Sequence, residues 1–237
     1  GRGSNLLVRD GGIRGAVIHP GKGEFDEVRV DGNFLFAGAG ARLKKIASSA
    51  RNAGLGGFEW MEGIPGNLGG ALRMNAGAMG GATFEAVETL RVMDHGGQVS
   101  ELAASEVKAE YRGCALLQTH LALGAVFRCR TAPREEVEQR MSAFSQKRWT
   151  SQPSAPSAGC CFKNPPTIAA GKLIDELGLK GLHVGGAMVS QEHGNFLVND
   201  GSATAQDVLD LITLLKARVR AARGIELQTE VEIVGED

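Results

Sequence analysis

Residues 63–81 read GIPGNLGGALRMNAGAMGG, with seven glycines in nineteen residues. Frequent glycine allows a backbone to turn with positive φ and to bring its N–H groups close to a flat, charged ligand. The stretch holds too much glycine for a long amphipathic helix. Ile64, Pro65 and Leu68 supply apolar anchors that a flexible glycine-serine linker lacks. We therefore predict ordered backbone folded around a ligand.

The composition indicates a globular protein with no charge-driven partner. The 237 residues carry a net charge of -1 and are 43% hydrophobic, which gives no electrostatic reason to expect nucleic acid or a membrane surface. The cysteines show no CxxC pair and no zinc spacing, so we expect no metal site and a reducing cytoplasm. They are Cys114, Cys129, Cys160 and Cys161. The sequence also lacks a signal peptide and an apolar run of about 18 residues, so we expect a soluble protein.

The pattern of elements predicts an α+β protein with a boundary near residue 150. Residues 1–150 alternate short strands with turns around one helix, and a second helix follows Pro133 and ends near Trp149. Residues 150–158 gather serine, proline and alanine, which marks the boundary. In the first part we expect strands at 5–8, 16–19, 27–30, 34–37, 89–93 and 121–130, and a helix over 43–50. In residues 151–237 we expect helices at 169–177 and 205–222 and strands at 195–199 and 226–234.

A second glycine-rich segment opens the chain. Residues 1–15 read GRGSNLLVRDGGIRG, which places N–H groups and short polar side chains where phosphate could bind. Two glycine turns flanking a strand explain the segment equally well. Together with residues 63–81 it suits an extended dinucleotide such as FAD, because the Rossmann order of strand, GxGxxG and helix is not present. Since Gly1 opens in the middle of a glycine motif, we expect that upstream sequence has been cut away.

Four further sites carry groups with chemical potential. Residues 156–165, PSAGCCFKNP, bring Ser157, Cys160 and Lys163 close in sequence, as donors for a carboxylate or phosphate. Tyr111-Arg112, Glu230 and His193 are the others. Taken alone, each favours a plain structural interpretation: free cysteines are mostly buried and inert, and polar residues mostly cover the surface.

Taken together, these segments resemble the UDP-N-acetylenolpyruvoylglucosamine reductase family, the flavoenzymes that make UDP-N-acetylmuramate for peptidoglycan. The motifs occur in the family's order along the whole chain. They are GSNLLVRDGG at 3–12, EWMEGIPGNLGGALRMNAGAMG at 59–80, YR at 111–112, PSAGCCFKNP at 156–165, AGKLIDELGLKG at 170–181, HGNFLVN at 193–199 and GIELQTEV at 224–231.

The resemblance implies an FAD-binding fold of two subdomains, the first largely missing here, followed by a small α/β substrate-binding domain. The FAD-binding domain would span residues 1–150 and the substrate-binding domain 151–237. NADPH would reduce FAD and leave, and the reduced flavin would pass hydride to the substrate, UDP-N-acetylglucosamine enolpyruvate. The absence of a tyrosine for a substrate-covering loop favours the family's shorter form. We also expect a cytoplasmic monomer that takes this small molecule and binds neither nucleic acid nor a membrane.

The resemblance also implies roles for individual residues. Arg112 and Glu230 match the family's arginine and glutamate, which suit stabilisation of a developing enolate and the substrate carboxylate. The implied cofactor-binding residues are Gly3, Ser4, Asn5, Gly63, Ile64, Pro65, Gly66, Gly69, Gly70, Asn75, Ala76 and Gly77. The implied substrate-binding residues are Tyr111, Lys163, Asn164, His193 and Asn195.

Two departures from the family pattern bear on activity. Cys160 stands where most of the family has the proton-donating serine, and a thiol is the stronger acid, so we predict that Cys160 is the general acid. The family's first subdomain has no counterpart before Gly1, so we expect this chain alone to bind FAD weakly. Two alternatives follow: a catalytically silent homologue that binds nucleotide sugar or flavin, and another FAD oxidoreductase of the same fold.

Overall fold

The computed structural model describes residues 1–237 and divides them into two compact units. Unit 1 comprises Gly1–Arg2 and Ile18–Arg148, and unit 2 comprises Gly3–Val17 and Trp149–Asp237. The chain changes unit close to the predicted boundary at residue 150, but residues 3–17 belong with the carboxyl-terminal part. Helix α3 (Arg134–Ser151) contains the change from one unit to the other.

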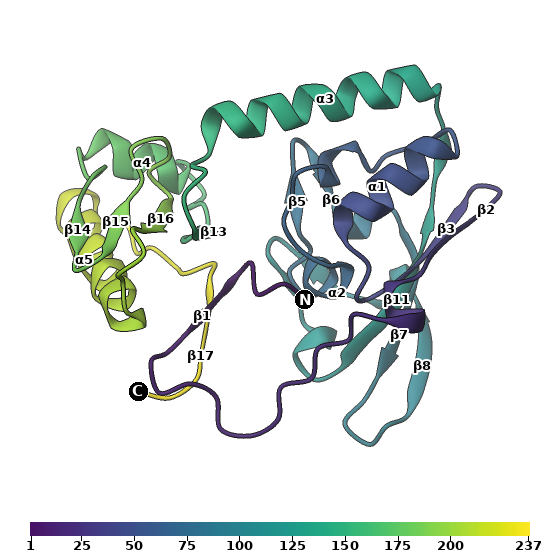
Figure 1. Cartoon of the computed structure of the whole chain (residues 1–237), viewed down its shortest axis with the longest axis horizontal. Coiled ribbons are helices and arrows are strands. Elements are labelled where there is room, and N and C mark those ends of the chain that lie inside the picture. The colour runs from purple at the N-terminus through teal and green to yellow at the C-terminus, as the bar shows by residue number, and fades with distance from the viewer. The chain divides into compact units, whose positions relative to one another are not determined.

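Unit 1 is built on one antiparallel sheet of five strands in the order β2-β3-β11-β7-β8 (Figure 1). Two hairpins form its edges. One turns at Gly32, which has a φ of 55°, and the other at Gly97, with a φ of 85°. The strands are β2 (Val28–Asp31), β3 (Phe34–Gly38), β7 (Val87–Met93), β8 (Val99–Ala103) and β11 (Leu121–Arg128).

The apolar core of unit 1 joins this sheet to helices α1 (Leu43–Asn52) and α2 (Leu68–Arg73). Leu35 and Phe127 of the sheet are fully buried, as are Ile46 of α1 and Leu72 of α2. Phe127 meets the ring of Phe58 edge-on at 5.4 Å. Burial of such side chains contributes about 1.5–3 kcal/mol each, so the sheet fixes where the two helices lie.

Short elements complete unit 1. Three two-stranded ribbons pair β4 (Leu55–Gly56) with β12 (Arg130–Thr131), β5 (Gly77–Ala78) with β6 (Gly81–Ala82), and β9 (Ala109–Glu110) with β10 (Gly113–Cys114). Five 3-10 turns lie at Gly23–Asp26, Glu59–Met61, Thr83–Glu85, Ala104–Glu106 and Leu116–Gln118.

Unit 2 contains a four-stranded antiparallel sheet in the order β13-β16-β15-β14, against which helices α4 and α5 are packed. Its core includes Phe162, Leu173, Leu211 and Leu215, all with 0–1% of their surface exposed. The elements are β13 (Ser157–Cys160), α4 (Ala170–Glu176), β14 (His183–Val184), β15 (Ala187–Val189), β16 (Phe196–Asn199) and α5 (Ala205–Arg223).

The amino-terminal strand is tied into unit 2. β1 (Leu6–Val8) runs parallel to β17 (Glu232–Val234), and the Asp10 carboxylate accepts the N–H groups of Ala205 and Gln206 at 2.8 and 3.0 Å. A carboxylate at this place satisfies free N–H groups in the first turn of α5 and faces the positive end of its dipole. These contacts explain why residues 3–17 belong to unit 2.

Several sequence-based expectations were wrong in detail. Residues 16–19 form no strand, and Val17 and Ile18 are 71% and 83% exposed. Regular strand in the closing segment is confined to β17, since the stretch from Glu226 is held by an isolated bridge between Phe162 and Thr229. None of the helices is both long enough and apolar enough to span a bilayer.

Candidate functional site

The glycine-rich segment is ordered backbone, as predicted. It holds α2 and the β5-β6 ribbon, and positive φ occurs at Gly63, Gly66, Asn75, Met79 and Gly80. The backbone N–H groups of Leu68 and Gly69 donate to the carbonyls of Ala41 and Ala39 at 2.9 and 2.7 Å. The segment is therefore fastened to the loop between β3 and α1.

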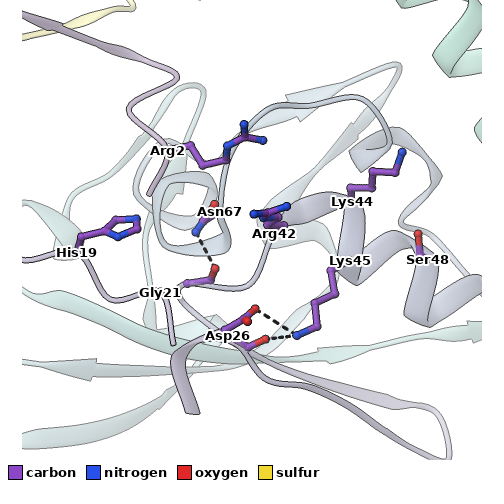
Figure 2. A pocket seen from close by; sticks show the side chains of 10 residues that line it. Arg2, His19, Gly21, Asp26, Arg42, Lys44, Lys45, Ser48 and Asn67 are labelled. Atoms are coloured by element: carbon purple, nitrogen blue, oxygen red, sulfur yellow. Dashed lines mark hydrogen bonds and ion pairs between the residues drawn. The ribbon is translucent and has the colours of Figure 1, made fainter. Parts of the chain in front are cut away.

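A pocket of about 450 Å³ lies in unit 1 where this loop meets the start of α1. Figure 2 shows the guanidinium groups of Arg2 and Arg42 and the ammonium group of Lys44 around it. Lys45 pairs with Asp26, and Lys44 pairs with Glu62 at 3.2 Å. The lining is His19, Gly21, Asp26, Gly40, Ser48 and Asn67 together with the four cations Arg2, Arg42, Lys44 and Lys45. Cations together with a helix N-terminus attract an anion.

Asn67 gives this pocket an unused buried acceptor. The residue is 7% exposed, and its Nδ2 donates to the carbonyl of Gly40 at 2.6 Å. Its Oδ1 has no hydrogen-bond partner, and burying such an atom unpaired costs free energy. The pocket therefore suits a ligand with both anionic groups and a donor, such as the phosphates and hydroxyls of a dinucleotide like FAD. The sequence analysis missed Arg2, Arg42 and Asn67, although Asn67 was visible as a polar residue within the glycine-rich segment.

The residues implied to bind cofactor are divided between the two units. Gly3, Ser4 and Asn5 belong to unit 2, and Gly63 to Gly77 belong to unit 1. Gly3 has a φ of 67° and its carbonyl accepts the N–H of Leu6 at 3.1 Å, which makes a tight turn. The Asn5 side chain donates to the carbonyl of Glu230 at 3.1 Å.

Tyr111 and Arg112 form the two-residue turn between β9 and β10. Arg112 has a φ of 57°, and its guanidinium carbon lies 4.9 Å from the centre of the Tyr111 ring. Its Nη2 donates to the carbonyl of Gly77 at 3.4 Å. A long side chain at positive φ is unusual and occurs where the surroundings enforce it, often at functional sites.

The two adjacent cysteines lie in different environments. Cys160 ends β13 and is half-buried, whereas Cys161 is 4% exposed. Burial raises the pKa of the Cys161 thiol to about 12, so Cys161 is a neutral packing group near pH 7. Cys160 is therefore the thiol with access to a ligand.

Glu230 lies opposite the cysteines in unit 2. Its backbone N–H donates to the carbonyl of Cys161 at 2.7 Å, one step from the bridge between Phe162 and Thr229. The electrostatic effect of Glu230 contributes to the raised pKa of Cys161. The structure thus brings Cys160 and Glu230 onto neighbouring segments, while Arg112 belongs to unit 1.

Asn195 is committed to the fold of this region. It is 2% exposed, its Oδ1 accepts the N–H of Phe162 at 2.8 Å, and its Nδ2 donates to the carbonyl of Phe162 at 2.7 Å. Its backbone carbonyl accepts the N–H of Cys161 at 2.7 Å. The Asn195 amide therefore holds the backbone of Phe162, two residues after Cys160, which favours an indirect role over the substrate contact that the resemblance implies.

His193 is a neutral, oriented imidazole. Its Nδ1 accepts the N–H of Asn195 at 3.1 Å, which requires the tautomer with the proton on Nε2. Its ring packs edge-on against Phe196 at 4.8 Å. Burial, with a smaller effect of the Lys180 charge, lowers the pKa of His193. The Nε2–H is left as a donor for a ligand.

Lys163 and Asn164 follow the cysteines in the chain. The N–H of Lys163 donates to the carbonyl of Gln228 at 2.9 Å and its side chain is half-buried. Asn164 is exposed, and its Oδ1 accepts the N–H of Ala170 at 3.0 Å, which caps α4. In unit 2, Cys160 and Lys163 therefore lie on one segment, and backbone hydrogen bonds join this segment to the one that carries Glu230 and to Asn195, two residues after His193. Asn164 holds the start of the adjoining helix α4.

Family models match both parts of the chain. The FAD binding domain matches residues 1–103, and the UDP-N-acetylenolpyruvoylglucosamine reductase C-terminal domain matches residues 152–234. The basic pocket with its unused Asn67 acceptor is consistent with the first match. The fold and these matches define an FAD-containing oxidoreductase.

Individual relatives narrow this class. The chain is 41% identical to the UDP-N-acetylenolpyruvoylglucosamine reductase of Syntrophomonas wolfei over 239 aligned residues, covering 100% of this chain and 80% of that protein. It is 46% identical to the Heliobacterium modesticaldum reductase, covering 76% of it. The crystal structure of the Thermus caldophilus reductase superposes with a TM-score of 0.86 at 42% identity, covering 98% of this chain and 82% of that one. The chain belongs to the UDP-N-acetylenolpyruvoylglucosamine reductase family.

Proposed function

We propose that this chain reduces UDP-N-acetylglucosamine enolpyruvate to UDP-N-acetylmuramate for peptidoglycan synthesis, with Cys160 as the proton donor. The observation that carries the proposal is the half-buried Cys160 thiol at the end of β13, on a segment whose neighbour carries Glu230. When bound, FAD supplies the hydride chemistry, taking hydride from NADPH and delivering it to the substrate double bond.

Addition of hydride to a carbon–carbon double bond leaves a carbanionic centre that needs one proton. A thiol is a far stronger acid than a serine hydroxyl, so the Cys160 thiol is chemically suited to give this proton. Cys161 does not compete, because its pKa of about 12 and its burial keep it out of proton exchange.

The negative charge that precedes protonation needs stabilisation. Arg112 is proposed to serve the developing enolate, because a guanidinium carries a fixed positive charge and a planar array of donors. Glu230 is proposed to act on the substrate together with Cys160, in the stabilisation that the resemblance implies for it. The Nε2–H of His193 and the Lys163 ammonium are proposed as donors to the nucleotide-sugar substrate, and Tyr111 as an apolar neighbour of it.

The basic pocket of unit 1 is proposed to hold the phosphates of FAD. Arg2 and Arg42 would neutralise phosphate charge, and the unused Oδ1 of Asn67 would accept a hydroxyl proton of the cofactor. The glycine-rich segment, with its Gly63, Gly66 and Gly77 backbone, would line the flavin. The implied roles of Gly3, Ser4 and Asn5 stay predictions.

Turnover by the purified chain tests the function. With added FAD, NADPH absorbance at 340 nm should fall only when UDP-N-acetylglucosamine enolpyruvate is present, and mass spectrometry should find a product heavier by two hydrogens. A flavin-loaded protein that oxidises no NADPH would indicate a silent binding homologue. NADPH oxidation that the substrate does not accelerate would indicate another FAD oxidoreductase.

We also propose that the enzyme works as a cytoplasmic monomer without nucleic-acid or membrane partners. Its cysteines are all free thiols, which suits a reducing compartment. Sedimentation of the FAD-loaded chain at a mass near 24.9 kDa would support the monomer, and a doubled mass would reject it.

A further inference from the structure

Asn75 links the glycine-rich segment to the turn that carries Arg112. Its Nδ2 donates to the carbonyl of Glu110 at 3.2 Å, and its Oδ1 accepts the N–H of Phe84 at 3.1 Å. Glu110 is the last residue of β9, and the turn formed by Tyr111 and Arg112 follows it directly. Both ends of the Asn75 amide are thus engaged within unit 1.

A second contact joins the same two segments in the opposite direction. Arg112 Nη2 donates to the carbonyl of Gly77 at 3.4 Å, two residues beyond Asn75. Each segment therefore gives the other one side-chain donor: Asn75 to the backbone before Arg112, and Arg112 to the backbone after Asn75. Two links in opposite directions restrict the rotation of the turn as well as its distance from the glycine-rich segment.

Both linked residues have left-handed backbone. The φ is 41° at Asn75 and 57° at Arg112. Asparagine tolerates this region, but arginine does so rarely, so the Arg112 conformation must be enforced by its surroundings. The Glu110 carboxylate does not supply that restraint, because it pairs with Lys108 at 2.6 Å. The Glu110 carbonyl, held by Asn75, is the part of this residue that faces the glycine-rich segment.

We propose that Asn75 is a positioning residue for Arg112 rather than a flavin contact. It holds the turn in its left-handed form and so sets the direction of the guanidinium. The inference rests on the proposed role of Arg112 toward the substrate. A misplacement of about 1 Å in a catalytic group can cost about a hundredfold in rate, so a loosened turn should slow the substrate step more than cofactor binding.

The test uses Asn75→Gly, because glycine keeps the positive φ and removes only the amide. Asn75→Asp is the near-isosteric variant that keeps the acceptor for Phe84 and loses the donor to Glu110. The matched control is Met79→Gly, which changes another left-handed residue of the same segment, with a φ of 53°. A direct readout in the cofactor-free chain is amide hydrogen exchange in the 109–114 peptide. Both Asn75 variants should exchange there about tenfold faster, and Met79→Gly should not.

Stopped-flow half-reactions at saturating FAD give the second readout. Both Asn75 variants should slow flavin reoxidation by the enolpyruvyl substrate about tenfold or more, with NADPH-driven flavin reduction and FAD affinity within about twofold of the wild type. Unchanged exchange at 109–114 would overturn the proposal. So would a loss of FAD affinity with unchanged reoxidation, which would make Asn75 a flavin contact. Arg112→Ala separates the two claims: if it leaves reoxidation unchanged, the proposed role of Arg112 fails even where the exchange result holds.

Discussion

Replacement of Asn195 by alanine should destabilise unit 2 strongly, because it removes two hydrogen bonds from the buried backbone of Phe162. The Asn195 amide satisfies both the N–H and the carbonyl of Phe162, at 2.8 and 2.7 Å, and Phe162 is 0% exposed. Alanine cannot replace either contact, and water does not reach these groups from the surface. The segment that runs from Cys160 to Phe162 would lose this side-chain restraint.

The magnitude follows from the two backbone groups left unpaired. Each buried, unsatisfied donor or acceptor costs about 1–3 kcal/mol, so Asn195→Ala should lower the free energy of unfolding by about 2–6 kcal/mol. That is a large share of a typical total of about 5–15 kcal/mol. The control is Asn164→Ala, which removes a single part-buried hydrogen bond to the N–H of Ala170 at the start of α4 and should cost about 1 kcal/mol.

Urea unfolding followed by circular dichroism measures both variants on one scale. Asn195→Ala should shift the midpoint well below that of Asn164→Ala. If the two variants lose equal stability, the hydrogen bonds of Asn195 are not what holds the Phe162 segment, and the Asn195 side chain is free for the substrate after all.

Three further predictions concern pH, packing and helix capping. Burial lowers the pKa of His193 below its usual 6.5, so the unfolded chain takes up a proton more readily, and stability should fall as the pH drops from about 7.5 to about 5.5. The melting temperature of His193→Gln should depend less steeply on pH than that of the wild type, and equal pH dependence would contradict the lowered pKa of His193. Gly81→Ala would place a Cβ 2.4 Å from Cδ1 of Trp60, so it should shift the tryptophan emission and cost about 1–3 kcal/mol, and unchanged emission would show that the ring has room. Asp10→Ala removes two N–H acceptors at the start of α5 and should cost about 0.5–2 kcal/mol in urea unfolding, whereas no loss would place the stability of this helix elsewhere.

The sequence predicted elements with strong local signals. The helix over residues 205–222 has an apolar stripe and ends before Gly224, whose φ of 66° completes the cap, and the observed α5 spans Ala205–Arg223. Glycine at a tight turn, as at Gly32 and Gly97 with their positive φ, is a local signal of the same kind. Local signals fix an element without tertiary information.

The partners of short strands could not be predicted in the same way. The strand at Leu6–Val8 was expected, but its pairing with Glu232–Val234 depends on contacts between the two ends of the chain. The apolar run at Ala16–His19 also looked like a strand, yet it has no neighbouring strand and stays exposed. An apolar run or an alternating pattern indicates that a segment can form a strand. It does not indicate whether a partner strand exists.

The candidate site shows the same limit. Sequence motifs singled out Cys160, Arg112 and Glu230. Only the structure shows that Cys161 is buried, with a pKa of about 12, and that both ends of the Asn195 amide are hydrogen-bonded to the Phe162 backbone. Asn67 and the pocket cations come from separate segments, and no single motif contains them. Burial and hydrogen-bond partners depend on tertiary contacts, which a motif does not encode.

The proton-donor role of Cys160 is the central claim, and anaerobic stopped-flow measurement of the two half-reactions tests it most directly. In Cys160→Ala, flavin reduction by NADPH should stay within about twofold of the wild type, while flavin reoxidation by the enolpyruvyl substrate should slow by about 10²–10⁴. Cys160→Ser should recover a large part of that loss, because a hydroxyl can still give a proton. Cys160→Ala that reoxidises at the wild-type rate would contradict the account.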